Sequence, residues 1–203
     1  MSALGSLFLY AAFVENMPLT FFLGLCTFIA LSRRPSSAVG LGVAMIAVLG
    51  VTVPLNHVIY ALLLAPGAWG WAGMPGLDLS YLSLIAFIGV IAAVVQLLEM
   101  VLDRYFPAIY TAFGVFLPLL TVQCAILGGS LFMVERKYDL AESAVFGLGA
   151  GTGFAVAVIM LGAIRTRLAY ADLPDGLRGL GITFVIAGMM SLGFSAFAQM
   201  VAS

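Results

Sequence analysis

Residues 38–64 read AVGLGVAMIAVLGVTVPLNHVIYALLL, a stretch without a charged side chain. A transmembrane helix needs about 20 consecutive apolar residues, and this stretch exceeds that length. Comparable stretches fall near residues 4–32, 78–102, 108–134, 141–164 and 178–201. Because backbone polar groups in lipid must be satisfied within the segment, each stretch is predicted to be a helix. The sequence therefore predicts an all-α integral membrane protein with six transmembrane helices.

The composition of the whole chain also indicates a lipid environment. Hydrophobic residues make up 64% of the 203 residues and charged residues only 8%, whereas soluble domains carry about 25% charged residues. The net charge of −1 gives no basis for a nucleic-acid partner. The N-terminus lacks a basic region and a small-residue cleavage site, so we expect the first apolar stretch to stay as a span.

Basic residues are distributed unevenly between the predicted loops. The loops after the first, third and fifth helices carry Arg33, Arg34, Arg104, Arg165, Arg167 and Arg178, and the opposite side carries only Arg136 and Lys137. The positive-inside rule then places the first group in the cytoplasm and both termini outside. The loop at 65–77 is apolar, and its Trp69 and Trp71 are expected at the headgroup level.

The two halves of the chain share short motifs in the same order. SAVGLG at residues 37–42 corresponds to SAVFGLG at 143–149, and IAFI at 85–88 corresponds to ITFV at 182–185. A Pro-Leu pair begins at Pro18 in the first span and at Pro118 in the fourth. Because each half has three spans, the second must enter the membrane from the opposite face. We expect one membrane domain of two inverted repeats, 1–103 and 104–203, with functional sites near the midplane.

The chain has two cysteines, Cys26 and Cys124, at corresponding places in these repeats. Each lies near helix-breaking Pro or Gly residues, and we interpret the pair as metal ligands. Iron–sulfur clusters and closed tetrahedral sites take four ligands, so a paralogous partner with the same fold is expected to supply the other two. Two alternatives stay open. The cysteines could be small apolar filler, or they could form a disulfide, which needs Cα atoms within about 7 Å.

Three stretches carry a resemblance to a known family. They read ENMPLTFFLGLCTF at residues 15–28, FLPLLTVQCAI at 116–126 and GLRGLGITF at 176–184. Over its full length the sequence resembles the membrane subunits of the Nqr and Rnf complexes. Within that family it is most similar to the E-type subunit of the Na+-translocating NADH:quinone oxidoreductase (Nqr). The D-type subunit of Nqr and the A-type and E-type subunits of Rnf are relatives.

The resemblance implies a membrane subunit of a redox-driven Na+ pump that oxidises NADH and reduces quinone, with no activity or catalytic residue of its own. The D-type subunit of Nqr would be the paralogous partner. Cys26 and Cys124, from helices 1 and 4 broken near the membrane centre, would be two of the ligands of a shared [2Fe–2S] cluster or single iron that relays electrons. FMN, FAD, riboflavin and quinone would bind to other Nqr subunits. The location would be the bacterial inner (cytoplasmic) membrane, with both termini periplasmic.

Four polar residues in the spans are further candidates. Thr27 and Gln123 lie next to the cysteines, where hydrogen bonds would tune a metal centre; ordinary bonds between helices are the alternative. Glu15 and Glu99 are candidates for a Na+ path, because acids inside a membrane are costly and by default functional. The alternatives are a structural acid at the helix break for Glu15, and an ion pair with Arg104 or contact with headgroups for Glu99.

Two other features have simpler interpretations. Gly147, Gly149, Gly151 and Gly153 open the fifth span without a preceding strand, so they predict close helix packing rather than a nucleotide-binding loop. His57 is the single histidine and is interpreted as a packing or interfacial residue.

Two rival functions remain. A small secondary transporter also shows inverted repeats and helices interrupted by Pro and Gly; the cysteines would then be incidental, and Glu15 would coordinate a cation or substrate. An Rnf-type subunit, coupled to ferredoxin and NAD rather than to quinone, is the alternative within the family.

Overall fold

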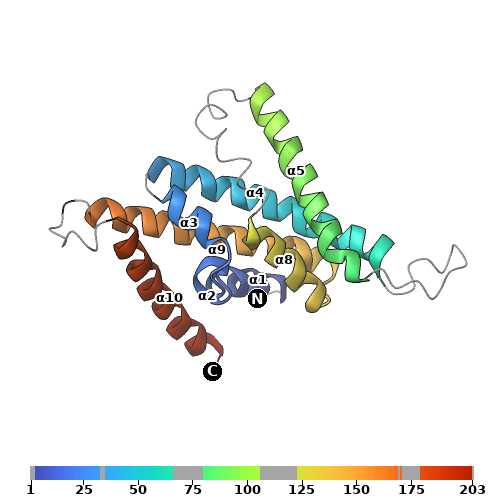
Figure 1. Ribbon diagram of the computed structural model, residues 1–203. Helices are drawn as coiled ribbons and strands as arrows, with labels where there is room; N and C mark the ends of the chain where they lie inside the picture. Colours follow the sequence, from blue (N-terminus) through green and yellow to red (C-terminus); the bar gives the residue numbers. More distant parts are fainter. Residues whose placement is uncertain are drawn as a thin grey trace, which may run out of the picture. The chain divides into compact units, whose positions relative to one another are not determined.

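The computed structural model describes residues 3–32, 35–65, 80–105, 123–168, 170 and 179–202. Within these ranges every regular element is a helix (Figure 1), which confirms the all-α membrane class. In the same ranges four helices are long and apolar enough to cross a membrane: Ser37–Leu64, Ser83–Tyr105, Leu140–Leu168 and Leu180–Met200. They coincide with the second, third, fifth and sixth predicted spans.

The first predicted span is a series of short helices. These are α1 (Ala3–Leu9), the π-helical turn η1 (Tyr10–Val14), α2 (Met17–Thr20) and α3 (Leu25–Leu31). Glu15 ends η1 by donating its backbone N–H to the carbonyl of Tyr10 at 2.9 Å, and Asn16 is extended. The break precedes Pro18, which occupies the first turn of α2, where its missing N–H costs no hydrogen bond. The prediction that helix 1 is broken is therefore confirmed.

A second break separates α2 from α3. Phe22 and Gly24 have positive φ angles of 56° and 80°, a conformation that ends helices and that non-glycine residues rarely adopt. The chain then restarts as α3, and its Phe28 N–H donates to the carbonyl of Gly24 at 3.0 Å. Cys26 therefore lies directly after a change in chain direction.

The fourth predicted span is described from Gln123 onward, as α8 (Cys124–Glu135). Residues 108–122 of that span, including Pro118, lie outside the described residues, as do Trp69 and Trp71. The break predicted for helix 4, the count of six spans and the headgroup position of the two tryptophans stay predictions.

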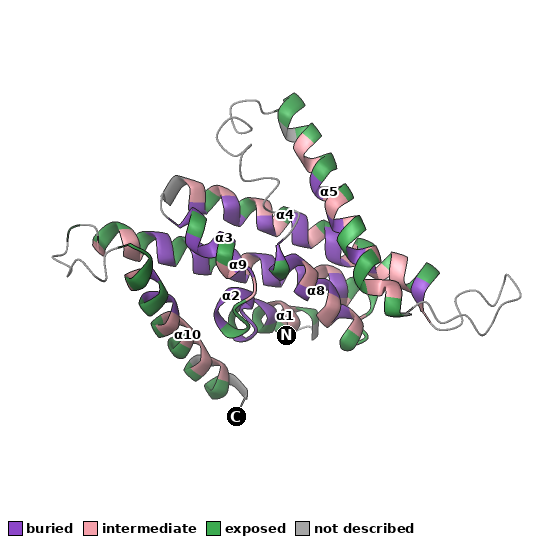
Figure 2. Cartoon of the chain, viewed as in Figure 1, coloured by how far each residue is buried: buried purple, intermediate pink, exposed green. Residues whose placement is uncertain are grey.

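The remaining helices have the following bounds. The second span is α4 (Pro35–Ile59), continued by the π-helical turn η2 (Tyr60–Leu64), and the third is η4 (Ser80–Leu82) followed by α5 (Ser83–Tyr105). The fifth span is α9 (Leu140–Leu168) and the sixth is α10 (Leu180–Ala202). In the apolar part of α9, 61% of the residues are buried, against 17% in α5 and 24% in α10 (Figure 2). The apolar surfaces of α5 and α10 thus remain open to lipid or to other chains.

The chain divides into two compact units, which are described separately. Unit 1 comprises residues 1–47 and 148–203, and unit 2 comprises residues 48–147. Each unit takes segments from both predicted repeats, and the repeat boundary at residue 103 stays a prediction.

In unit 1, α4 and α9 run antiparallel with their backbones in contact. A Cβ atom added to Gly42 of α4 would lie 2.8 Å from the Cβ of Ala155, and one added to Gly151 of α9 would lie 2.7 Å from the Cα of Ile46. On another side of α9, Gly153 lies against the carbonyl of Ala12. Small residues four apart permit such close approach, so the packing interpretation of these glycines is confirmed.

In unit 2, α5 packs against α8, and aromatic pairs hold the ends of the helices. The rings of Tyr60 and Phe87 are 6.3 Å apart, and those of Tyr138 and Phe146 are 5.3 Å apart. A Cβ atom added to Gly147 would lie 2.6 Å from the carbonyl oxygen of Leu49. The close contact of α4 with α9 is therefore present in this unit as well.

Candidate functional site

Cys26 lies in the first turn of α3, two residues after the left-handed Gly24. Its side chain is exposed, and it forms no disulfide. Thr27, the next residue, is buried, and its hydroxyl donates to the carbonyl of Gly24 at 2.9 Å. The single proton of Thr27 is therefore used within its own turn, so Thr27 has no hydroxyl proton left to give to a sulfur of Cys26.

Cys124 is the first residue of α8 and is also exposed and outside any disulfide. It belongs to unit 2, whereas Cys26 belongs to unit 1. Each cysteine thus lies in the first turn of a helix, directly after residues with non-helical dihedral angles. A disulfide between them is not formed, while their interpretation as ligands of one metal stays a prediction.

Gln123 is the N-cap residue of α8, with φ −78° and ψ 120°. Its backbone carbonyl accepts from the N–H groups of Ile126 and Leu127 at 3.2 and 3.4 Å. The side chain is only 2% exposed, and neither its amide nitrogen nor its amide oxygen has a hydrogen-bond partner among the described residues. A buried carboxamide without partners beside an exposed thiol is available for a group that binds to that thiol.

The two candidate acids are in different surroundings. Glu15 belongs to unit 1 and is buried, 8% exposed, at the first break of the first span. Asn16 beside it donates through Nδ2 to the carbonyl of Gly153 at 2.8 Å and to that of Ala12 at 3.2 Å. These bonds fix the break against α9. They give Asn16 a structural role that the sequence alone did not suggest.

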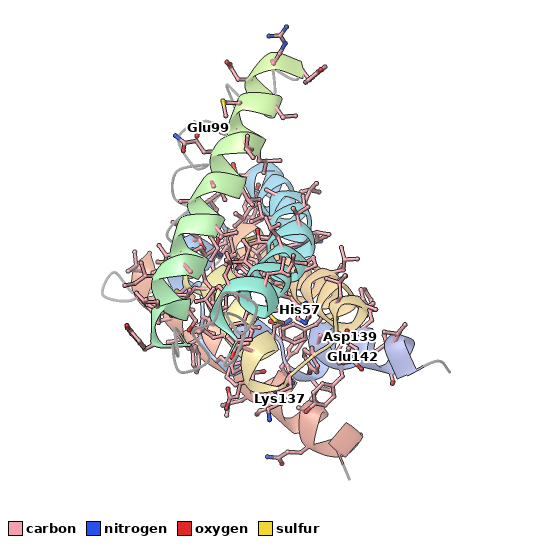
Figure 3. All side chains as sticks on the ribbon, turned by 90° about the vertical axis from the view of Figure 1, so that its right-hand side faces the viewer. His57, Glu99, Lys137, Asp139 and Glu142 are labelled. Atoms are coloured by element: carbon pink, nitrogen blue, oxygen red, sulfur yellow. The ribbon has the colours of Figure 1, made fainter. Side chains whose placement is uncertain are left out.

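Glu99 belongs to unit 2 and lies half-buried on α5. Figure 3 shows it on a part of α5 far from His57, Asp139 and Glu142. Asp139 and Glu142 are engaged locally, because the Asp139 N–H donates to Glu142 Oε2 at 3.1 Å and so caps the start of α9. Glu99 is therefore not part of that acidic cluster. Within the described residues no group of three or more His, Cys, Asp or Glu side chains is arranged to hold a metal ion.

Comparison with known proteins decides the family. Residues 4–201 match the model of the family described as "Rnf-Nqr subunit, membrane protein". The chain belongs to the Rnf-Nqr family. Proteins named as the E-type subunit of the Na(+)-translocating NADH-quinone reductase from Ectopseudomonas mendocina (strain ymp) and Hahella chejuensis (strain KCTC 2396) are each 62% identical to it over 192 residues, 95% of either chain. The protein of that name from Idiomarina loihiensis is 59% identical over the same share.

Two polar contacts in this Rnf-Nqr chain were missed by the sequence reasoning. Arg165 Nη1 donates to the carbonyl of Ile29 at 2.9 Å and to Ser32 Oγ at 2.7 Å, which ties the end of α3 to α9 within unit 1. In unit 2, Asn56 Nδ2 donates to Ser130 Oγ at 2.7 Å. The available signal was a polar side chain inside an otherwise apolar stretch, which by default indicates a function or a bond between helices.

Proposed function

We propose that this chain is the E-type subunit of a Na+-translocating NADH:quinone reductase, and that Cys26 and Cys124 bind an iron centre shared with a second membrane subunit. The observation that carries the proposal is the matched placement of the two cysteines. Each is exposed in the first turn of a helix that follows non-helical residues. The family membership and the names of its relatives supply the enzyme complex.

The local chemistry of the thiols fits an iron centre. Thiolates are the usual ligands of iron–sulfur clusters, and a thiol at a helix N-terminus is more easily deprotonated because the helix dipole favours negative charge there. Cys124 has this placement at the start of the 12-residue helix α8. Exposed thiols are open to a partner chain, whereas thiols buried in the core of this subunit would not be.

Two cysteines leave a four-ligand site half complete. A paralogous protein, the D-type subunit of Nqr, supplies the other two ligands in this proposal. A [2Fe–2S] cluster or a single iron held there would supply one-electron transfer within the membrane. The residues of this chain hold two of the ligand sulfurs, and the buried Gln123 offers an amide N–H beside one of them. FMN, FAD, riboflavin and quinone belong to other subunits.

The remaining details follow the same proposal. The chain lies in the bacterial inner membrane as two inverted three-helix repeats, with its Arg-rich loops in the cytoplasm and both termini in the periplasm. Glu15 and Glu99 contribute to a Na+ path through or beside this subunit. An Rnf-type complex is the second candidate within the family, because the matching family model covers both kinds of complex.

The test is made on the assembled complex purified after co-expression of all subunits. Iron content and the EPR spectrum are measured for the wild type and for Cys26→Ala and Cys124→Ala. Each variant is expected to lose the signal of this centre while the flavin signals of other subunits remain. Ala30→Ser, an exposed position one turn beyond Cys26 on α3, is the matched control.

The opposite result has a clear form. A secondary transporter would show no iron signal, and Cys26→Ala would leave its transport activity intact. A complete EPR signal in both cysteine variants would remove the ligand assignment. Reduction of the purified complex by ferredoxin rather than turnover with quinone would identify an Rnf-type complex.

A further inference from the structure

Unit 2 contains a group of fully buried polar side chains from three helices. Thr52 and Asn56 lie on α4, Ser130 lies on α8 and Ser143 lies on α9, and each has 0% of its surface exposed. Four such residues inside apolar helices are costly in a membrane unless their polar atoms are satisfied. Their hydrogen bonds therefore indicate what the group can bind.

The Asn56–Ser130 bond fixes the direction of the Asn56 carboxamide. Ser130 Oγ donates its proton to the carbonyl of Ile126 at 3.2 Å, so it can only accept from Asn56. Asn56 accordingly presents Nδ2 to Ser130 at 2.7 Å. Its oxygen, Oδ1, is buried and has no hydrogen-bond partner among the described residues.

Two more oxygens are in the same condition. Thr52 Oγ1 and Ser143 Oγ are buried and also lack a partner within the described part of the chain. Thr52 precedes Asn56 by one helical turn, so both lie on one face of α4. Three unsatisfied oxygens in one unit exceed what a well-packed core of this size tolerates without a ligand or water.

The packing of α9 on α4 places Ser143 beside this face. A Cβ atom on Gly147 would lie 2.6 Å from the carbonyl oxygen of Leu49 and 3.2 Å from the Cβ of Val53. Ser143 lies one turn before Gly147 on the same face of α9. Because the two helices run antiparallel, that turn of α9 faces the turn of α4 after Val53, which contains Asn56.

The chemistry of these oxygens selects the ligand. A carboxamide oxygen and two hydroxyl oxygens are hard, uncharged ligands, whereas sites for divalent cations such as Ca²⁺ and Mg²⁺ use carboxylates. We propose that Thr52, Asn56 and Ser143 form a binding site for a monovalent cation, which on the proposed function is Na+. Ser130 holds Asn56 in position. It follows Cys124 by six residues on α8, about 9 Å along the helix axis, so the site lies on the helix that carries a proposed iron ligand.

The test uses isosteric variants in the assembled complex. Thr52→Val, Ser143→Ala and Asn56→Leu each remove one proposed ligand oxygen. The measurements are the Na+ concentration for half-maximal NADH:quinone turnover and the binding of ²²Na+ to the purified complex. Each variant is expected to raise the half-maximal concentration about tenfold, the effect of losing one moderately strong interaction, with turnover at saturating Na+ changed less than about twofold.

Two control substitutions remove hydroxyls that are satisfied within their own helices. They are Thr166→Val, whose Oγ1 donates to the carbonyl of Gly162 at 2.8 Å, and Ser195→Ala, whose Oγ donates to that of Leu192 at 2.9 Å. Both are expected to leave the Na+ dependence unchanged. If Asn56→Leu fails to assemble, Thr52→Val and Ser143→Ala decide the question, since each loses only one hydroxyl.

The outcomes separate this inference from the proposed function. Unchanged Na+ dependence and unchanged ²²Na+ binding in the variants, with the wild-type iron signal intact, would overturn the cation site and indicate that these oxygens bind water. Absence of iron and of any Na+ dependence in the wild-type complex would instead refute the proposed function. A shift in the Na+ dependence of the three variants alone supports the site.

Discussion

Arg165 Nη1 lies 2.7 Å from Ser32 Oγ, a bond that joins the end of α9 to the residue that caps α3. The same nitrogen donates to the carbonyl of Ile29 at 2.9 Å. Charged donors strengthen hydrogen bonds, and the last carbonyls of a helix lack partners within that helix. Arg165 therefore fixes the C-terminal end of the short helix that carries Cys26.

Replacing Arg165 is expected to weaken unit 1. Arg165→Gln removes the charged donor from Ile29 and Ser32, and we expect a loss of about 1–3 kcal/mol, the usual cost of a buried polar group left without its charged partner. The measurement is the thermal unfolding midpoint of the purified complex. Arg167→Gln is the control, since Arg167 is exposed on the same helix and its loss changes the net charge equally. Equal midpoints for the two variants would refute the role given to Arg165.

Gly153→Ala is expected to separate η1 from α9. The added methyl group would meet the carbonyl of Ala12 and lie 3.0 Å from its Cα, and backbone atoms cannot move aside as a flexible side chain can. We expect destabilisation of about 1–3 kcal/mol or failure to assemble, measured by the yield and thermal stability of the complex. Gly188→Ala on α10, where an added Cβ has no atom within 4 Å, is expected to be neutral or slightly stabilising. Equal effects of both variants would contradict the close-packing argument.

Gln123 and Thr27 are predicted to differ in their effect on the iron centre. On the proposed function, Gln123→Leu removes an amide N–H beside Cys124, and a donor near a sulfur stabilises the reduced, more negative state. We expect the midpoint potential to fall by about 40 mV, equivalent to about 1 kcal/mol for one electron. Thr27→Val is the matched control, because the Thr27 proton is already donated to Gly24. Redox titration followed by EPR is the measurement, and equal potentials in wild type and Gln123→Leu would reduce Gln123 to a packing residue.

The two acids are predicted to affect Na+ rather than electron transfer. Glu99→Gln and Glu15→Gln remove a charge without changing side-chain size, and on the proposed Na+ path each slows Na+ uptake or Na+-stimulated turnover by tenfold or more. Uptake of ²²Na+ by proteoliposomes containing the complex is the measurement. Asp103→Asn, an exposed acid one turn beyond Glu99 on α5, is the control. Unchanged uptake in either variant removes that residue from the path.

The sequence predicted the helices well because their signal is local. A long apolar stretch without charges must be a membrane helix, and the described spans fall where the stretches do. Pro18 predicted a break in the first span, but the break lies at Glu15 and Asn16, before the proline. A proline is tolerated in the first turn of a helix, so it marks the restart rather than the end.

The side-chain contacts could not be predicted in the same way. Asn16 and Gly153 are separated by 137 residues and Asn56 and Ser130 by 74, and nothing in the local pattern states which distant carbonyl or hydroxyl a polar residue will meet. The glycines of α9 predicted close packing but not the helices against which they pack. The placement of Cys124 in the first turn of α8 likewise depends on a chain path that composition does not encode.

The spacing of the glycines in α9 limits how the chain length can vary. Gly151 touches α4 and Gly153 touches η1, both within unit 1, so one rotational setting of α9 serves two neighbours at once. An insertion of a single residue between Ala150 and Gly151 would turn everything before it by about 100° relative to these contacts, bringing bulkier side chains where backbones now meet. Insertions and deletions among descendants of this sequence are therefore expected to fall between the helices, while α9 keeps its length.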